Sequence, residues 1–167
     1  MADTALAQRV VSALKKAGKT LSSAESCTGG LLAKEITDIP GASSVFHGAV
    51  VSYVNPVKHI VLGVSGADLD RYGAVSEPVS RQMAEGARML LHTDLAVSTT
   101  GVAGPDRDDF GNEVGTVYIS LAAGDKTHCF LRRFSGDRTA IREAAATFAL
   151  ELVLRVLTGD ALPDNAL

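Results

Sequence analysis

The chain has few cysteines, no long apolar run and no cluster of basic residues. Its two cysteines, Cys27 and Cys129, are too few for a disulfide scaffold and are expected to remain thiols in a reducing compartment. No run of about 18 apolar residues, the length needed to span a membrane, occurs. The first residues alternate charge with Ala and Val, unlike a signal peptide. These absences predict a cytoplasmic protein with no membrane partner.

The charge balance is slightly acidic. There are 16 Lys and Arg residues against 19 Asp and Glu, a net charge of −3, and no segment gathers the basic ones. We therefore expect no nucleic-acid partner. A length of 167 residues with 46% hydrophobic and 21% charged residues suits one packed domain over residues 1–167, with a frayed tail at 159–167.

Hydrophobic periodicity predicts an alternation of helices and strands. Helices are expected at 4–17, 31–36, 56–62, 67–72, 77–90 and 141–156, and strands at 21–24, 45–54, 94–98, 115–122 and 127–134. The helix that starts at Glu77 should bury one face made of Val79, Met83, Ala87 and Leu90. The last two strands are joined through Gly124 and Asp125, which is typical of an antiparallel hairpin. The pattern therefore predicts an α/β protein with a mixed sheet.

The segment from Ala24 to Gly30, with the sequence AESCTGG, lies where the first strand passes into a helix. Ser26 is expected at the carboxyl end of the strand, the edge where open α/β sheets bind ligands. With Gly29 and Gly30 behind it, the first helical turn can bring backbone N–H groups close to a ligand oxygen, as an oxyanion hole or a phosphate cradle. The alternative is that Thr28 caps the helix and the glycines only make the bend.

Ser26 needs a base in order to act as a nucleophile. A lysine can serve if burial lowers its pKa from about 10.4 toward neutrality. Lys58 is the best candidate because it follows a strand end, whereas Lys15, Lys16 and Lys34 fall on expected solvent faces. The alternative is an ordinary exposed lysine.

Cys27 offers a different nucleophile, with His59 as its base, because a helix N-terminus lowers the pKa of a thiol. The alternative is a small buried side chain. The four histidines, His47, His59, His92 and His128, show no metal-ligand or catalytic-triad spacing. We therefore expect no metal site.

Two later segments have features of binding sites. Residues 99–105 form a glycine-rich turn that leaves a strand, and a polar loop follows at 106–113. Arg138 follows a small-residue turn at a helix start, where a guanidinium and free N–H groups suit a phosphate. The alternative for Arg138 is a solvated side chain. The loop resembles a calcium loop only superficially, because Phe110 occupies a ligand position.

Taken in order, these segments closely resemble the carboxy-terminal domain of the CinA family. The resemblance rests on AESCTGG at 24–30, YVNPVK at 53–58, GAVSEP at 73–78, GVAGP at 101–105, VGTV at 114–117 and FSGDR at 134–138. It covers a core from about residue 5 to residue 157. It implies a three-layer α/β/α sandwich around a mixed sheet, in a stand-alone form without the amino-terminal domain of full-length CinA proteins.

The same resemblance implies a nicotinamide-nucleotide amidase, which converts nicotinamide mononucleotide to nicotinate mononucleotide and ammonia in pyridine-nucleotide recycling. Ser26 would attack the carboxamide, Lys58 would carry the proton, and Thr28 with the N–H groups after it would stabilise the oxyanion. No cofactor is implied. A homodimer or higher oligomer is implied, and alanine-rich faces such as 144–146 are candidates for its interface.

A wider set of residues in these segments would hold the ring, the ribose and the phosphate of the substrate. These are Glu25, Cys27, Gly29, Gly30, Tyr53, Asn55, Ser76, Thr100, Gly101, Ala103, Gly104 and Arg138.

The chain departs from the family pattern at two places. Val54 stands where the family usually has Ser or Thr, and Arg107 to Glu113 lacks the usual Gly-Gly and Lys-Pro pairs. The acidic groups of this loop oppose an anionic substrate, although salt screens exposed charges. Two alternatives therefore stay open: a non-catalytic nucleotide-binding or regulatory module, and an amidase for another small carboxamide.

Overall fold

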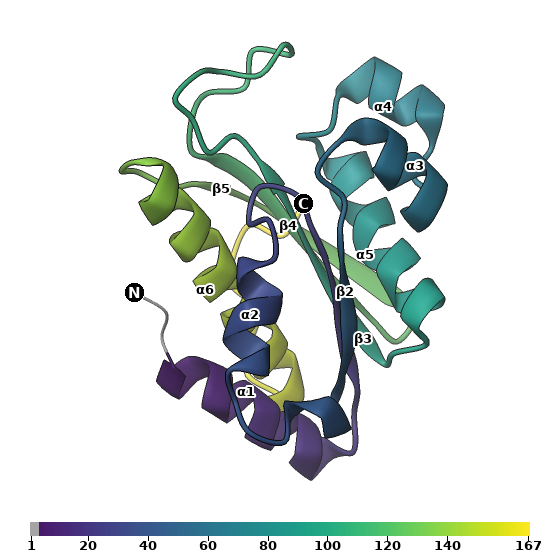
Figure 1. The fold of residues 1–167 in the computed structure, drawn as a ribbon, viewed down its shortest axis with the longest axis vertical. Helices are drawn as coiled ribbons and strands as arrows, with labels where there is room; N and C mark the ends of the chain where they lie inside the picture. The colour runs from purple at the N-terminus through teal and green to yellow at the C-terminus, as the bar shows by residue number, and fades with distance from the viewer. Residues whose placement is uncertain (1–3) are drawn as a thin grey trace.

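A five-stranded sheet in the order β2-β1-β3-β4-β5 forms the middle layer of the molecule (Figure 1). The computed structural model describes residues 4–167. Strands β1, β2 and β3 are parallel, and β4 and β5 form an antiparallel hairpin beside β3. The strands span Leu21–Glu25 (β1), Phe46–Val51 (β2), Leu95–Gly101 (β3), Thr116–Ala123 (β4) and Lys126–Arg133 (β5). The predicted mixed sheet is confirmed.

Helices cover both faces of this sheet (Figure 1). One face carries α1 (Thr4–Ala17), α2 (Leu31–Thr37) and α6 (Arg138–Thr158). The other carries α3 (Asn55–Leu62), α4 (Gly66–Tyr72) and α5 (Glu77–Leu91). A short 3₁₀ turn at Ala42–Ser44 precedes β2. The three-layer α/β/α sandwich is therefore confirmed.

The core lies on both sides of the sheet, since both faces are covered. The larger cluster joins α1, α2 and α6 to the sheet, and the smaller one packs Val79, Met83 and Ala87 of α5 against Ala96. Leu90 was expected on that same face of α5, but it is 47% exposed. The prediction is wrong at this turn because α3 ends with Leu62 against Gly86, one turn earlier.

The order of the strands places the carboxyl ends of β1 and β3 side by side. Parallel strands end at the same edge of the sheet, and Glu25 at the end of β1 pairs with Thr99 of β3. The chain leaves β1 toward α2 on one face and leaves β2 toward α3 on the other. Residues that follow β1, β2 and β3 therefore meet at one edge, where a divergence of the connections opens a crevice.

Two strand ends differ from the prediction by three residues each, whereas the other strand boundaries differ by one residue at most. β2 ends at Val51 rather than at residue 54, because the Ser52 N–H donates to Glu25 O while the Ser52 carbonyl accepts from the Lys58 ammonium. β3 continues to Gly101, because β4 pairs with it through Thr99, Thr100 and Gly101. The first half of the predicted glycine-rich turn is therefore strand.

The last residues after α6 contact the sheet, in the segment for which the sequence predicts a frayed tail. Ala166 bridges to Phe130 of β5, and the Leu167 N–H donates to Cys129 O. Arg81 of α5 donates to the carbonyl of Leu167. An outer strand offers unpaired backbone groups, and this segment occupies part of them along β5.

No helix within residues 4–167 is both long and apolar enough to cross a membrane. The cytoplasmic location expected from the sequence stays a prediction.

Candidate active site

Ser26 is the first residue after β1, in the tight turn that leads into α2. Its N–H donates to Thr99 O at 2.9 Å, which ties the turn to the neighbouring strand β3. Gly29 and Gly30 follow with φ angles of 58° and 97°, in the left-handed region that favours glycine. The two glycines reverse the chain within a few residues, and Ser26 stays at the sheet edge with only 9% of its surface exposed.

Glu25 holds this turn in place through a fully buried carboxylate. Its oxygens accept from the N–H groups of Gly30, Leu32 and Ala33 at 2.9–3.1 Å. These donors belong to the start of α2, where the helix dipole favours a negative charge. The carboxylate thus serves as the cap of α2, and it does not line the pocket described below, contrary to the substrate contact expected for it.

The Thr28 side chain is also used inside the protein. Its hydroxyl donates to Glu25 Oε2 at 2.7 Å and lies 2.7 Å from Thr99 Oγ1. It is fully buried, so the hydroxyl is not free to stabilise an oxyanion. The backbone N–H of Thr28, in contrast, donates to no acceptor within residues 4–167. If Thr28 contributes to an oxyanion site, it does so through its main chain.

Lys58 lies beside Ser26 in the interior. It belongs to α3, whose first turn contains Pro56, and only 1% of its surface is exposed. Its Nζ atom lies 3.1 Å from Ser26 Oγ and 2.6 Å from Ser52 O. Burial lowers the pKa of its ammonium from 10.5 to about 8. A nucleophilic hydroxyl and a weakened cation in direct contact are the arrangement that a serine–lysine pair requires.

The rival cysteine pair does not form. Burial raises the pKa of the Cys27 thiol to about 12, so the thiolate is disfavoured despite the nearby helix. The Nδ1 atom of His59 lies 2.7 Å from Val64 O, so the ring hydrogen-bonds to the main chain after α3 and not to Cys27. Cys27 is 6% exposed and packs as a small apolar side chain.

A pocket of about 200 Å³ opens over Ser26 and Lys58. Several of the predicted binding residues line it together with these two, namely Cys27, Tyr53, Asn55, Thr100, Gly101, Ala103 and Arg138. Gly101 permits the close packing of this wall, because a Cβ atom there would lie 2.7 Å from Thr116 O. Residues scattered over more than a hundred positions thus converge on one cavity.

Arg138 spans one side of this cavity at the start of α6. Its guanidinium donates to Gly104 O at 2.7 Å and to the Tyr53 hydroxyl at 2.9 Å. Asp137 caps the same helix by accepting from the Ala140 N–H. The side chain of Arg138, rather than the capped helix end, is therefore the group that can receive an anion here.

The other predicted binding residues lie near the pocket without lining it. Gly29 and Gly30 follow Ser26 in the turn, Gly104 O accepts from Arg138, and the Ser76 hydroxyl donates to Gly73 O just before α5. Two wall residues were not predicted, Ala74 and Val75. Both fall within the predicted motif GAVSEP, but small apolar side chains carry no chemical signal that marks them as binding residues.

The loop that departs from the family pattern projects beyond the sheet edge between β3 and β4 (Figure 1). Asp108 organises it by accepting from the N–H groups of Phe110 and Asn112. Arg107 pairs with Glu113 at 2.9 Å, so one of the acidic groups is already partly neutralised. Val54 is 54% exposed and does not line the pocket.

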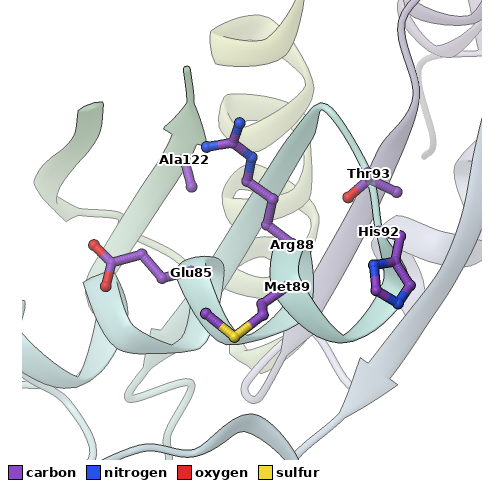
Figure 2. A pocket seen from close by; sticks show the side chains of 6 residues that line it. All are labelled: Glu85, Arg88, Met89, His92, Thr93 and Ala122. Carbon is purple, nitrogen blue, oxygen red and sulfur yellow. The ribbon is translucent and has the colours of Figure 1, made fainter. Parts of the chain in front are cut away.

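A larger hollow lies elsewhere in residues 4–167. About 560 Å³ opens among Glu85, Arg88, Met89, His92, Thr93 and Ala122 (Figure 2). Thr93 contacts Ser22 near the amino end of β1, the opposite end of the strand from Ser26. We assign the chemistry to the smaller cavity, because it holds the contacting hydroxyl and amine. No group of three potential metal-ligating side chains occurs within residues 4–167.

Comparisons with known proteins agree on one family. A family model described as the CinA C-terminal domain matches residues 3–157. The chain is 46% identical over 151 residues to the nicotinamide-nucleotide amidohydrolase PncC of Enterobacter agglomerans, covering 90% of this chain and 92% of that protein. A crystal structure of a CinA superfamily protein from Klebsiella pneumoniae has a TM-score of 0.92 at 31% identity, covering 95% of this chain and 99% of that one.

Other relatives are longer than this chain. A CinA-like protein of Syntrophomonas wolfei is 48% identical over 148 residues, which are 89% of this chain but 36% of that protein. The chain spans 36–38% of the length of several further curated relatives.

Proposed function

Because the chain belongs to the CinA C-terminal domain family, we propose that it hydrolyses the carboxamide of nicotinamide mononucleotide to nicotinate mononucleotide and ammonia. The observation that carries this proposal is the 3.1 Å contact between Ser26 Oγ and a buried Lys58 Nζ at the base of a pocket. The reaction would serve pyridine-nucleotide recycling.

In the first half of the reaction, Ser26 Oγ attacks the carboxamide carbon while neutral Lys58 takes the hydroxyl proton. The C–N bond then breaks, and Lys58 returns the proton to the departing nitrogen, which leaves as ammonia. An ester between Ser26 and the nicotinate group remains. In the second half, water attacks the ester, Lys58 takes and returns a proton again, and the carboxylate product leaves.

Attack on the carbonyl carbon places a negative charge on the carbonyl oxygen, which needs hydrogen-bond donors in each half of the reaction. The Ser26 N–H is occupied by Thr99 O and the Gly29 N–H by Ser26 O, whereas the Thr28 N–H is free within residues 4–167. We assign the oxyanion site to the main chain of the turn after Ser26, with the N–H groups of Cys27 and Thr28 as its donors, since neither donates to a main-chain acceptor within residues 4–167. This assignment replaces the hydroxyl of Thr28.

Arg138, Tyr53 and Asn55 are the groups that suit the nucleotide part of the substrate. The pocket is smaller than the 300 Å³ or more that is usual for small-ligand sites. A substrate phosphate would take the donors that Arg138 now gives to Gly104 O and Tyr53 Oη, and this exchange would widen the mouth. The aromatic ring of Tyr53 is 56% exposed and can stack on the substrate as the mouth opens.

The protein is also proposed to work as a homodimer or higher oligomer. The alanine-rich segment suggested for the interface does not serve, because Ala145 and Ala146 are fully buried within the subunit. Ile60 of α3 and Met89 of α5, each 77% exposed, are the most exposed large apolar side chains within residues 4–167. The helical layer that contains α3 and α5 is therefore the better candidate.

The direct test is ammonia release from nicotinamide mononucleotide by the purified protein, with and without EDTA. We expect turnover that EDTA leaves unchanged. Ser26→Ala should lose nearly all kcat and retain substrate binding, whereas its matched neighbour Cys27→Ala should keep most activity. An inactive Cys27→Ala beside a normal Ser26→Ala would overturn the assignment of the nucleophile.

The same assay separates the two alternatives. Binding of the nucleotide without any ammonia release would indicate a non-catalytic module. Release of ammonia only from other carboxamides would indicate a different amidase.

A further inference from the structure

Arg142 reaches from α6 to the turn that carries Ser26. Its Nε donates to Cys27 O at 3.0 Å, and its Nη2 donates to Thr28 O at 2.9 Å. Both acceptors are main-chain carbonyls of consecutive residues, directly after Ser26. One guanidinium thus fixes the orientation of two consecutive peptide groups.

Because a peptide group is planar, a contact that fixes its carbonyl also fixes the direction of its N–H group. The peptide between Cys27 and Thr28 is trans, so its N–H points opposite to its C=O. Because Cys27 O faces Arg142, the Thr28 N–H is turned away from Arg142. The next N–H, that of Gly29, donates back to Ser26 O. Of these two N–H groups, Thr28 alone keeps its donor free within residues 4–167.

The turn needs such a support. Gly29 and Gly30 have positive φ angles and contribute no side chain that could hold it, and a Cβ atom on Gly29 would lie 3.4 Å from Arg142 Nη2. Glu25 accepts hydrogen bonds from N–H groups at the start of α2, and Arg142 donates hydrogen bonds to carbonyls of the turn. Loss of the guanidinium would leave Cys27 O without its donor and Thr28 O with only the Leu31 N–H, so the peptide between Cys27 and Thr28 would be held less firmly.

We propose that Arg142 is a positioning residue for catalysis, which orients the Thr28 N–H toward the oxyanion that forms at Ser26. The proposal rests on the proposed amidase function. Arg142 does not line the pocket, so it acts through the main chain and not on the substrate. A donor misplaced at an oxyanion lowers kcat and leaves substrate binding largely unaffected.

The chain offers a matched control. Arg81 of α5 also donates to two main-chain carbonyls, those of Thr127 and Leu167, and neither belongs to the turn after Ser26. Arg142→Met and Arg81→Met each remove two contacts of this type, and Arg81→Met also removes an ion pair with Glu77. Both should lose some resistance to urea, but only Arg142→Met should lose kcat.

The experiment measures three quantities on both variants and on the unmodified protein: kcat and KM for nicotinamide mononucleotide, the rate at which a fluorophosphonate labels Ser26, and the urea midpoint. For Arg142→Met we expect kcat and the labelling rate to fall about 10- to 100-fold, with KM changed less than about 3-fold. The pH dependence set by Lys58 should stay in place. Guanidinium at a non-denaturing concentration should restore part of the kcat of Arg142→Ala but nothing in Arg81→Ala.

Three results would overturn the proposal. These are an unchanged kcat and labelling rate in folded Arg142→Met, an equal loss in Arg81→Met, and a loss that appears in KM alone. The labelling reaction needs no nucleotide, so it keeps this test apart from the proposed function. A protein that labels at Ser26 but releases no ammonia would refute the substrate and still test Arg142, and a protein that does neither would refute both.

Discussion

Lys58 is a buried cation without an acidic partner. Within residues 4–167 no carboxylate forms an ion pair with it, and its Nζ contacts only Ser26 Oγ and Ser52 O. A nearby carboxylate would have stabilised the ammonium and raised its pKa. The lack of one lets burial bring the pKa down to about 8, within reach of physiological pH. The site therefore gains a usable base, and the stability of the folded protein is lowered.

The rate should depend on pH through this group. A base must be neutral, and below its pKa of about 8 the amine of Lys58 is increasingly protonated. We expect kcat/KM to rise about tenfold per pH unit up to the neighbourhood of pH 8 and to level off above it. Initial rates of ammonia release in a constant-ionic-strength buffer series measure this, and a rate that is flat between pH 6 and about 8 would contradict the role of Lys58.

The same group should make the inactive variant Lys58→Met more stable. A fall in pKa from 10.5 to about 8 corresponds to about 3 kcal/mol of destabilisation at neutral pH. Loss of the two hydrogen bonds offsets part of this, at about 1 kcal/mol each. A net gain of about 1–2 kcal/mol is expected from urea unfolding at pH 7.

The sign of this effect is set by the lowered pKa. The folded protein releases the Lys58 proton near pH 8, whereas the unfolded chain holds it to about 10.5, so the penalty is complete below pH 8 and disappears as the pH rises to 10.5. The stability advantage of Lys58→Met should shrink over that interval. An advantage of equal size at pH 7 and 10.5 would point to packing instead.

At the scale of elements, the turn from β1 into α2 depends on one side chain. Glu25 is the last residue of β1, yet its carboxylate accepts from Ala33, eight positions later. The glycines make this possible by folding the start of α2 back over the strand end. The strand, the catalytic turn and the helix therefore form one connected unit.

Glu25→Gln should weaken this unit. The amide keeps one acceptor oxygen, loses the charge that favours a helix N-terminus, and brings an NH₂ group against N–H donors. We expect a loss of about 2–4 kcal/mol in urea unfolding, together with a fall in kcat. Glu151→Gln on the exposed face of α6 is the matched control, and equal losses in both variants would disprove the role of Glu25.

The sequence allowed the strand–turn–helix unit and the Ser26 and Lys58 candidates to be predicted, because residue types and breaks in periodicity are local signals. It did not allow the role of Glu25 to be predicted, since the cap spans eight residues through two left-handed glycines. The role of Arg142 could not be predicted either. Its acceptors are main-chain carbonyls more than a hundred positions away. Every residue has such a carbonyl, so the residue types do not indicate which ones accept a hydrogen bond.

At the scale of the whole molecule, the assembly state is the main open prediction. The outer surface of α3 and α5 exposes Ile60, Val61, Met89 and Leu90. Apolar side chains on helices are stabilised when a second surface covers them. The same layer carries Lys58, so association through it would join the interface to the catalytic helix.

Light scattering at micromolar concentration should therefore give at least twice the monomer mass of 17.3 kDa. A double variant, Ile60→Glu with Met89→Glu, should shift the protein toward the monomer. Lys15→Glu with Lys16→Glu, on the exposed face of α1, changes more charge and should leave the mass unaltered. A monomer in the unmodified protein would reject the prediction.

The catalytic pair and several binding residues lie in separate parts of the sequence, which affects how substrate specificity can change within this fold. Ser26 and Lys58 lie 32 positions apart in the first part of the chain, while Thr100, Gly101, Ala103 and Arg138 come from later segments. The reacting pair and this later part of the recognition wall can therefore vary separately, by mutation or by recombination between relatives, while Tyr53 and Asn55 stay in the segment that carries Lys58. A library confined to positions 100–104 and 138 should yield enzymes with new substrate ranges that keep the pH profile of the parent.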